Sequence, residues 1–180
     1  MSEPTQERFL TEVANHRMTV LIDTATHRHL HFSDGTMNMH FMLTTWPGYL
    51  CISGDMGCFV FQRLKDMFCF FRGERINVSY WAEKIQAGSW REHSPKYARE
   101  RVCELVADET IPADHDEYDR LDYCNPQDLI EHLMESGYQD AWEESFMVPT
   151  YHYLWCLQAI VWGIQQYDQA NVNKLLQGVA

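Results

Sequence analysis

Basic residues are scarce in this chain of 180 residues, since 14 lysines and arginines stand against 26 aspartates and glutamates and give a net charge of −12. This balance argues against a broad basic face, the usual means of gripping DNA or an anionic membrane. Hydrophobic residues are not scarce, at 46% of the chain, so we expect a packed core rather than general disorder. The length predicts one domain over residues 1–180.

Several signals of particular functions are also missing. The most apolar run, Tyr151 to Ile164, is too short to cross a bilayer, and the first residues lack the layout of a secretory signal, so we expect no membrane partner. The six cysteines include no Cys-x-x-Cys pair, and we interpret them as small core residues in a reducing compartment, not as a zinc site or disulfide framework. A P-loop, a dinucleotide fingerprint and a nucleophile elbow are absent. We therefore assign no catalytic residue and no cofactor.

The acidity is unevenly distributed along the chain. Residues 63–101 hold nine bases and five acids, whereas residues 102–144 hold fourteen acids and one base. The second stretch carries a net charge of −13, and the rest of the chain sums to +1. The acidity is thus a local property of 43 residues, which makes it a candidate surface.

Residues 27–62 predict an antiparallel meander of about four strands. Residues 27–33 and 36–45 alternate between apolar and polar side chains on either side of a two-residue hairpin signal, Asp34-Gly35. Closing the hairpin at this turn pairs Leu30 with Met39 and His29 with His40. Further strands are expected at 49–53 and 58–62, whereas 17–26 fits either a strand or a helical turn.

Helical patterns dominate the remainder. Residues 63–107 predict helices with a mildly basic surface, 108–124 an acidic loop, and 125–169 further helices, first acidic and then buried. Ser94-Pro95 and Asn125-Pro126 each combine an N-cap residue with a proline at the first helical position. The segment from Thr150 to about Gln169 is apolar on nearly every side, which is typical of a buried helix. The fold class is therefore α+β, a small antiparallel sheet packed against a helical bundle with a buried central C-terminal helix.

Two blocks of the sequence carry a family resemblance. The first is Thr45–Gly57 with the following Phe59–Phe61 and Asp66–Phe68, and the second runs from Leu154 to Asp168. Both resemble a group of uncharacterised proteins encoded by tailed bacteriophages and prophages, over most of residues 5–168. The resemblance implies a viral accessory protein that acts in the cytoplasm of a bacterial host, for example against host defence, and it carries over no catalytic residue.

The acidic segment is the leading candidate site. Ordered carboxylates can imitate the phosphate array of DNA and occupy the basic groove of a host defence or DNA-handling protein, without strong DNA binding by the chain itself. A solubilising loop and a contact with a second copy of the chain are the alternatives. A calcium loop is disfavoured, because the glycine and terminal glutamate of an EF-hand are missing. The candidate partner-binding residues are Asp108, Glu109, Asp114, Asp116, Glu117, Asp119, Asp122, Asp128, Glu131 and Glu135.

Two other groups of residues suggest a nucleotide or small-molecule binder, or an enzyme. His27, His29 and His31 alternate on one strand with His40 opposite, so they either bind a transition metal or form a solvated or partner-facing surface. The bases of residues 63–101 are interleaved with aromatics and either bind a nucleotide by stacking or form the outer faces of amphipathic helices. That basic-aromatic patch comprises Arg63, Lys65, Arg72, Arg75, Lys84, Arg91, Lys96, Arg99 and Arg101, with Phe70, Tyr80, Trp81 and Trp90.

Overall fold

The computed structural model describes residues 4–73, 75–112, 118, 121 and 123–178. These residues form two compact units, where the length led us to expect one domain. The sheet unit comprises the residues up to Trp90 and from Thr150 onward, and the acidic unit comprises residues 91–149. The acidic unit is therefore an insertion within the sequence of the sheet unit.

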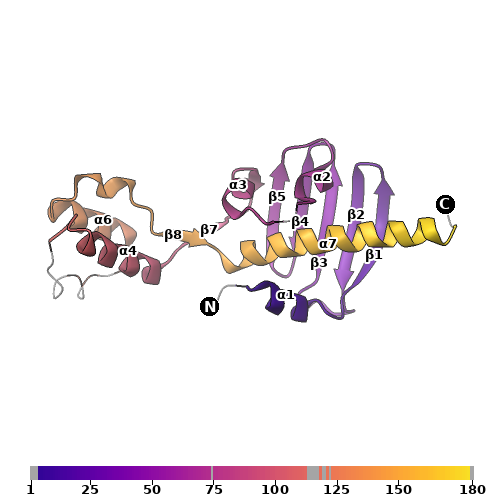
Figure 1. Cartoon of the computed structure of the whole chain (residues 1–180), viewed down its shortest axis with the longest axis horizontal. Coiled ribbons are helices and arrows are strands. Elements are labelled where there is room, and N and C mark those ends of the chain that lie inside the picture. Colours follow the sequence, from indigo (N-terminus) through magenta and orange to yellow (C-terminus); the bar gives the residue numbers. More distant parts are fainter. Residues whose placement is uncertain (1–3, 74, 113–117, 119–120, 122, 179–180) are drawn as a thin grey trace. The chain divides into compact units, whose positions relative to one another are not determined.

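The sheet unit contains six antiparallel strands that follow one another in chain order (Figure 1). The fold class is therefore α+β as expected, with six strands in this sheet rather than about four. The strands are β1 (Arg17–Thr24), β2 (His27–Ser33), β3 (Phe41–Trp46), β4 (Tyr49–Gly54), β5 (Gly57–Gln62) and β6 (Ile85–Ala87). Strict alternation of buried and less buried residues along β2 and β3 turns one face of the sheet toward the core.

The register that we expected for the β2–β3 hairpin is wrong. Leu30 pairs with Leu43 rather than Met39, and Phe32 pairs with Phe41. The strands are joined by the loop 34–40 rather than by a two-residue turn. Because the register is shifted by an even number of residues, the buried face is unchanged.

Three short helices accompany the sheet: α1 (Gln6–Glu12), α2 (Met67–Phe71) and α3 (Val78–Ala82). Residues 63–107 were expected to be helical, but the chain leaves α3 and returns to the sheet as β6. Asp66 caps α2 by accepting a hydrogen bond from the Phe68 N–H. The same carboxylate binds the buried Arg28 of β2 in a two-point ion pair with distances of 2.9 and 3.0 Å.

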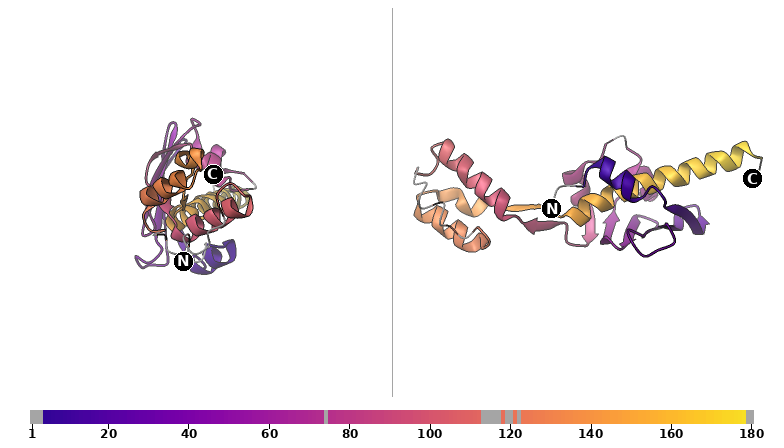
Figure 2. Two further views of the ribbon diagram at one scale, coloured as in Figure 1. Left: turned by 90° about the vertical axis from the view of Figure 1, so that its left-hand side faces the viewer. Right: turned by 90° about the horizontal axis from the view of Figure 1, so that it is seen from below.

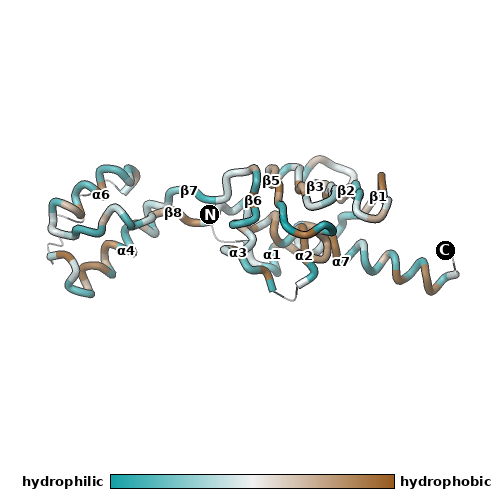
Figure 3. Tube along the Cα trace, turned by 90° about the horizontal axis from the view of Figure 1, so that it is seen from above, coloured by the Kyte–Doolittle hydropathy of each residue, from teal (hydrophilic) through white to brown (hydrophobic). Residues whose placement is uncertain are grey.

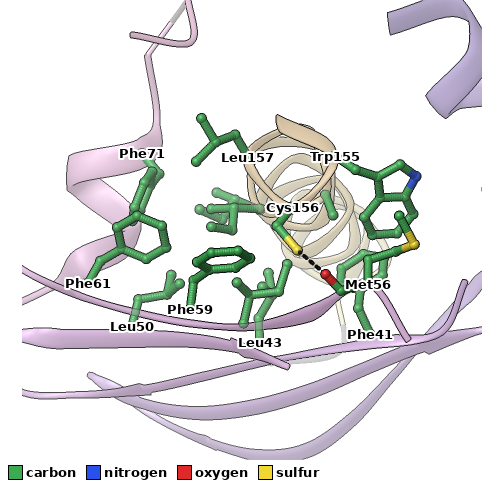
Figure 4. Packing of buried hydrophobic residues seen from close by; sticks show 14 of the residues in the cluster. Phe41, Leu43, Leu50, Met56, Phe59, Phe61, Phe71, Trp155, Cys156 and Leu157 are labelled. Atoms are coloured by element: carbon green, nitrogen blue, oxygen red, sulfur yellow. Dashed lines mark hydrogen bonds between the residues drawn. The ribbon is translucent and has the colours of Figure 1, made fainter. Parts of the chain in front are cut away.

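The long helix α7 (Tyr151–Leu176) lies along one face of the sheet (Figures 1 and 2). Thr150 caps it, and nine of its residues are buried, which confirms the expected buried C-terminal helix. Figure 4 shows Cys156 pointing from α7 toward the sheet, where its thiol donates to the Met56 carbonyl at 3.5 Å, with Leu157 and Trp155 extending to either side. Gly163 allows the close approach, since a Cβ there would lie 2.8 Å from Leu43 Cδ1. The last turns of α7 alternate between hydrophilic and hydrophobic residues (Figure 3).

The acidic unit has a separate small core. Its ends pair as the strands β7 (Arg91–His93) and β8 (Met147–Pro149), between which lie α4 (Pro95–Ala107), α6 (Pro126–Glu135) and the 3-10 helix η1 (Gln139–Glu143). Ser94 and Asn125 cap α4 and α6 as the sequence predicts. Ala98, Val102 and Leu105 of α4 share this core with Leu129 and Leu133 of α6. The residues that the structure describes form these two packed units rather than one sheet backed by a helical bundle.

Candidate functional site

The acidic unit holds almost all of the net charge. Residues 91–149 contain sixteen acids and five bases, a net charge of −11, and the remainder of the chain nets −1. The acidic stretch recognised in the sequence, residues 102–144, therefore lies within one folded unit. Its carboxylates belong to a module with its own hydrophobic core.

The outer face of α6 presents three of the candidate acids. Asp128, Glu131 and Glu135 are exposed, whereas Leu129 and Leu133 point into the core. Spacings of three and four residues place these acids on one side of the helix. None of the three forms an ion pair within the described part of the chain. The face is thus a row of unneutralised carboxylates held by a packed helix.

Asp108 and Glu109 lie at the end of α4, at its C-cap and at the next position. The Glu109 N–H donates to the Val106 carbonyl at 3.1 Å and the Thr110 N–H to the Leu105 carbonyl at 2.9 Å, the two bonds of a Schellman motif. Carboxylates at the C-terminal end of a helix interact unfavourably with the negative end of the helix dipole. Helix stability therefore does not account for these two acids.

The candidates Asp114, Asp116, Glu117, Asp119 and Asp122 lie outside the described residues. Three described residues of the same segment are buried in the core of the acidic unit: Ile111, Tyr118 and Tyr123 are between 3% and 6% exposed. The Tyr123 hydroxyl donates to the Tyr118 carbonyl at 3.0 Å. At these three positions the segment is part of the packed unit.

Glu144, in contrast, has a structural role. Arg101 of α4 binds its carboxylate at 2.7 and 3.0 Å, and the Tyr138 hydroxyl donates to it at 2.9 Å. The hydrogen bond from the Arg101 guanidinium holds the pKa of Glu144 below its ordinary value. This carboxylate is therefore already neutralised within the unit and does not contribute a free charge to the surface.

Two exposed apolar side chains next to the acids were missed by sequence reasoning. Trp142 of η1 is 64% exposed and Met134 of α6 is 49% exposed. Large apolar residues in helical segments normally belong to the core, so neither was singled out. The flanking residues Asp140 and Glu143 were the available signal, because acids on both sides of a tryptophan suit an exposed position.

The histidine face is only partly as expected. His27, His29 and His31 point away from the core, but His29 lies opposite Thr44, whose hydroxyl is 2.8 Å from its Nδ1. His40 lies in the loop before β3, with its Nδ1 2.7 Å from the Met37 carbonyl. No group of three or more histidine, cysteine or acidic residues is placed to hold a metal ion within the described ranges.

The basic-aromatic patch is divided between the two units. Arg63, Lys65, Arg72, Arg75 and Lys84 belong to the sheet unit, and the other four bases belong to the acidic unit. Several of the bases are already paired: Arg72 binds Asp168 at 2.7 Å, Lys84 binds Glu83 at 3.0 Å, and Lys96 binds Glu100 at 3.6 Å. The patch is therefore not a continuous nucleotide-binding surface of either unit.

The cysteines do not behave as a group of core residues. Only Cys156 is buried, and Cys58, Cys69, Cys103 and Cys124 are exposed. Cys51 lies on β4 with its Sγ 3.8 Å from that of Cys58 on β5. Burial, followed by the neighbouring Cys58, raises the pKa of the Cys51 thiol to about 12. A thiol with such a pKa stays protonated and is a poor nucleophile near neutral pH.

No helix in the described part of the chain is both long and apolar enough to span a membrane. Comparison with models of protein families, with curated proteins and with solved structures gave no match to this chain. The resemblance to phage-encoded proteins therefore stays a prediction from the sequence.

Proposed function

We propose that this protein is a non-catalytic binding protein whose acidic unit occupies a positively charged groove of another protein. The observation that carries the proposal is the net charge of −11 on residues 91–149, a unit with its own core. A charge of this size on one small unit accelerates association with a basic partner and disfavours the binding of acidic proteins.

The spacing of the acids favours a groove that normally holds nucleic acid. The helix rise places Asp128, Glu131 and Glu135 about 4.5 and 6 Å apart along the axis of α6. One strand of duplex DNA carries a phosphate roughly every 3.4 Å along its axis. The row of carboxylates thus has a charge density of the same order as one DNA strand.

Exposed apolar residues favour a protein partner over simple ions. Trp142 and Met134 lie on the two elements, η1 and α6, that carry the free acids. Tryptophan is enriched among the residues that dominate binding energy at protein interfaces. A partner that combines basic residues with an apolar pocket would use both features.

The resemblance of the sequence to phage-encoded proteins supplies the biological setting of the proposal. The partner would then be a host defence or DNA-handling protein, and the site of action the cytoplasm of the bacterial host. The acidic surface is consistent with that setting, because many such host proteins bind DNA through basic grooves.

The test compares two double variants of the acidic unit. Glu131→Gln with Glu135→Gln removes two free charges of α6. Glu100→Gln with Glu104→Gln removes two charges of α4 that form ion pairs with Lys96 and Arg101. Both change the net charge by two. Wild type and variants are used to capture proteins from a bacterial lysate, and the affinity for the captured protein is then measured with purified components at low and high salt.

We expect the α6 variant to bind roughly tenfold more weakly at low salt, since exposed charge pairs contribute up to about 1 kcal/mol each. The α4 variant should bind nearly as tightly as wild type. High salt should weaken the wild-type and α4-variant complexes to a similar degree, and the α6-variant complex to a different degree. Duplex DNA should displace the captured protein. Equal effects of the two variants, or no displacement by DNA, would contradict the proposal.

A further inference from the structure

The sheet unit contains a cavity that the acidic surface does not use. Its wall is formed by residues of α1, of the segment after α2, and of α7, and α1 lies beside α7 in Figures 1 and 2. Its volume is about 520 Å³, within the usual range of roughly 300–1,000 Å³ for small-molecule sites. The cavity is therefore large enough for a ligand of metabolite size.

Aromatic and aliphatic side chains form the apolar part of the wall. Trp162 of α7 lies beside Phe9 of α1, with ring centroids 6.3 Å apart and the rings edge to face. Phe32 and Phe41 also contact the Trp162 indole, with ring centroids 5.7 and 6.2 Å away. The indole is thus fixed by packing while it still lines the cavity, which makes it suitable for contact with a planar ring.

A glutamine supplies an unsatisfied polar atom in the same wall. The Gln158 Nε2 donates to the Pro4 carbonyl, which fixes the orientation of the amide. Its Oε1 is buried and has no hydrogen-bond partner among the described residues. Because buried acceptors are nearly always satisfied, this oxygen is an unfilled hydrogen-bonding position behind the cavity wall.

A positively charged side chain also lines the cavity. Arg75 is exposed, lines the cavity and forms no ion pair with any described residue. Gln6 and Gln165 add two further amides to the wall. The cavity thus combines an aromatic ring, amide side chains and a guanidinium without an ion pair among the described residues, of which the last favours an anion.

From this combination we propose that the cavity binds a planar aromatic anion of the nucleoside monophosphate class. The base would lie against Trp162, and its phosphate would accept from Arg75. Binding here is independent of the acidic unit, since every residue of the cavity wall belongs to the sheet unit.

The proposal is tested by isothermal titration calorimetry of the full chain with the common nucleoside 5′-monophosphates and, separately, with the matching nucleosides. We expect at least one monophosphate to bind with a Kd on the order of 10 µM. Its nucleoside should bind at least about tenfold more weakly, because it lacks the group that contacts Arg75.

Three variants locate the site. Arg75→Gln should weaken the monophosphate at least about tenfold and leave the weaker nucleoside unchanged. Leu10→Trp, at a half-exposed position of the wall, should fill the cavity and abolish both. Arg63→Gln removes an exposed arginine outside the cavity wall and should change neither. The proposal is overturned if no monophosphate binds at millimolar concentration, or if Arg75→Gln and Arg63→Gln weaken binding equally.

Discussion

Glu109 occupies a position that ordinarily belongs to glycine. It has a φ of 56° and forms the left-handed residue of the Schellman motif that ends α4. The same motif ends α6, where the left-handed residue is Gly137 with a φ of 96°. Glutamate costs free energy at such a position both through its Cβ and through its charge at the negative end of the helix dipole. We interpret Glu109 as kept for its charge at the expense of stability.

Replacement of Glu109 by glycine should therefore stabilise the acidic unit. We expect Glu109→Gly to raise its free energy of unfolding by about 1 kcal/mol, because the left-handed strain and the unfavourable dipole contact are both removed. Native-state amide hydrogen exchange in α4 would measure the gain. Gly137→Ala is the matched control and should lower the stability of the same unit by a similar amount. A loss of protection in the Glu109→Gly variant would refute this account.

Local sequence signals predicted some of the interactions of individual residues. The caps at Ser94 and Asn125 each depend on residues next to them in sequence, and both are present. Arg28 was not predictable in this way. Its burial depends on Asp66, which is 38 residues away in the sequence and closes the ion pair only in the folded sheet unit.

At the scale of elements, the alternation of β2 and β3 predicted the buried face but not the register. The loop 34–40 is held from outside the hairpin, because Asp55 accepts a hydrogen bond from the Met39 N–H at 2.8 Å and donates its own N–H to the His40 carbonyl at 3.0 Å. The two-residue turn signal Asp34-Gly35 carries no information about such long-range contacts. Asp55 therefore has a structural role in holding the loop 34–40.

Gly54, at the end of β4, allows the close approach of the loop 34–40. A Cβ at this position would lie 2.2 Å from the His40 carbonyl oxygen and 2.7 Å from the Phe41 Cα, which are backbone atoms that cannot rotate away. Gly35 also has a positive φ, but a Cβ there would meet no atom within 4 Å. A comparison of substitutions at Gly35 and Gly54 therefore distinguishes the energetic cost of the backbone conformation from that of a steric clash.

We expect Gly35→Ala to cost about 1 kcal/mol in stability, from its left-handed backbone alone. Gly54→Ala should cost at least about 2 kcal/mol more, because overpacking against backbone adds to the strain. Urea denaturation of both variants, followed by circular dichroism, gives the comparison. Similar losses for the two variants would mean that the loop 34–40 can move away from Gly54.

At the scale of the whole molecule, the charge pattern anticipated the acidic unit better than the length did. No run of glycine, proline or serine marks its ends, so the sequence suggested one domain. The unit begins and ends instead in two short strands, where Arg91 pairs with Pro149. The acidic stretch of residues 102–144 lies inside these bounds, because the excess acids belong to the helices and connections between the two strands. The candidate surface was thus predictable from composition, whereas its boundaries required long-range strand pairing.

The two ends of the sheet unit at the insertion are joined by a hydrogen bond, since the Thr150 N–H donates to the Trp90 carbonyl at 2.9 Å. A linker of two or three glycines is therefore long enough to replace residues 91–149. We expect the resulting protein to fold, because the core cluster of the sheet unit contains no residue from 91–149. Its net charge would be −1.

This shortened protein should retain the binding of nucleoside monophosphates in calorimetry and lose the capture of the basic protein partner, so that the two proposed activities are assigned to separate units. Circular dichroism and a cooperative thermal transition would check the fold first. If the shortened protein fails to fold, the sheet unit depends on the insertion for its stability. If it folds and still captures the partner, the acidic unit is not the binding surface.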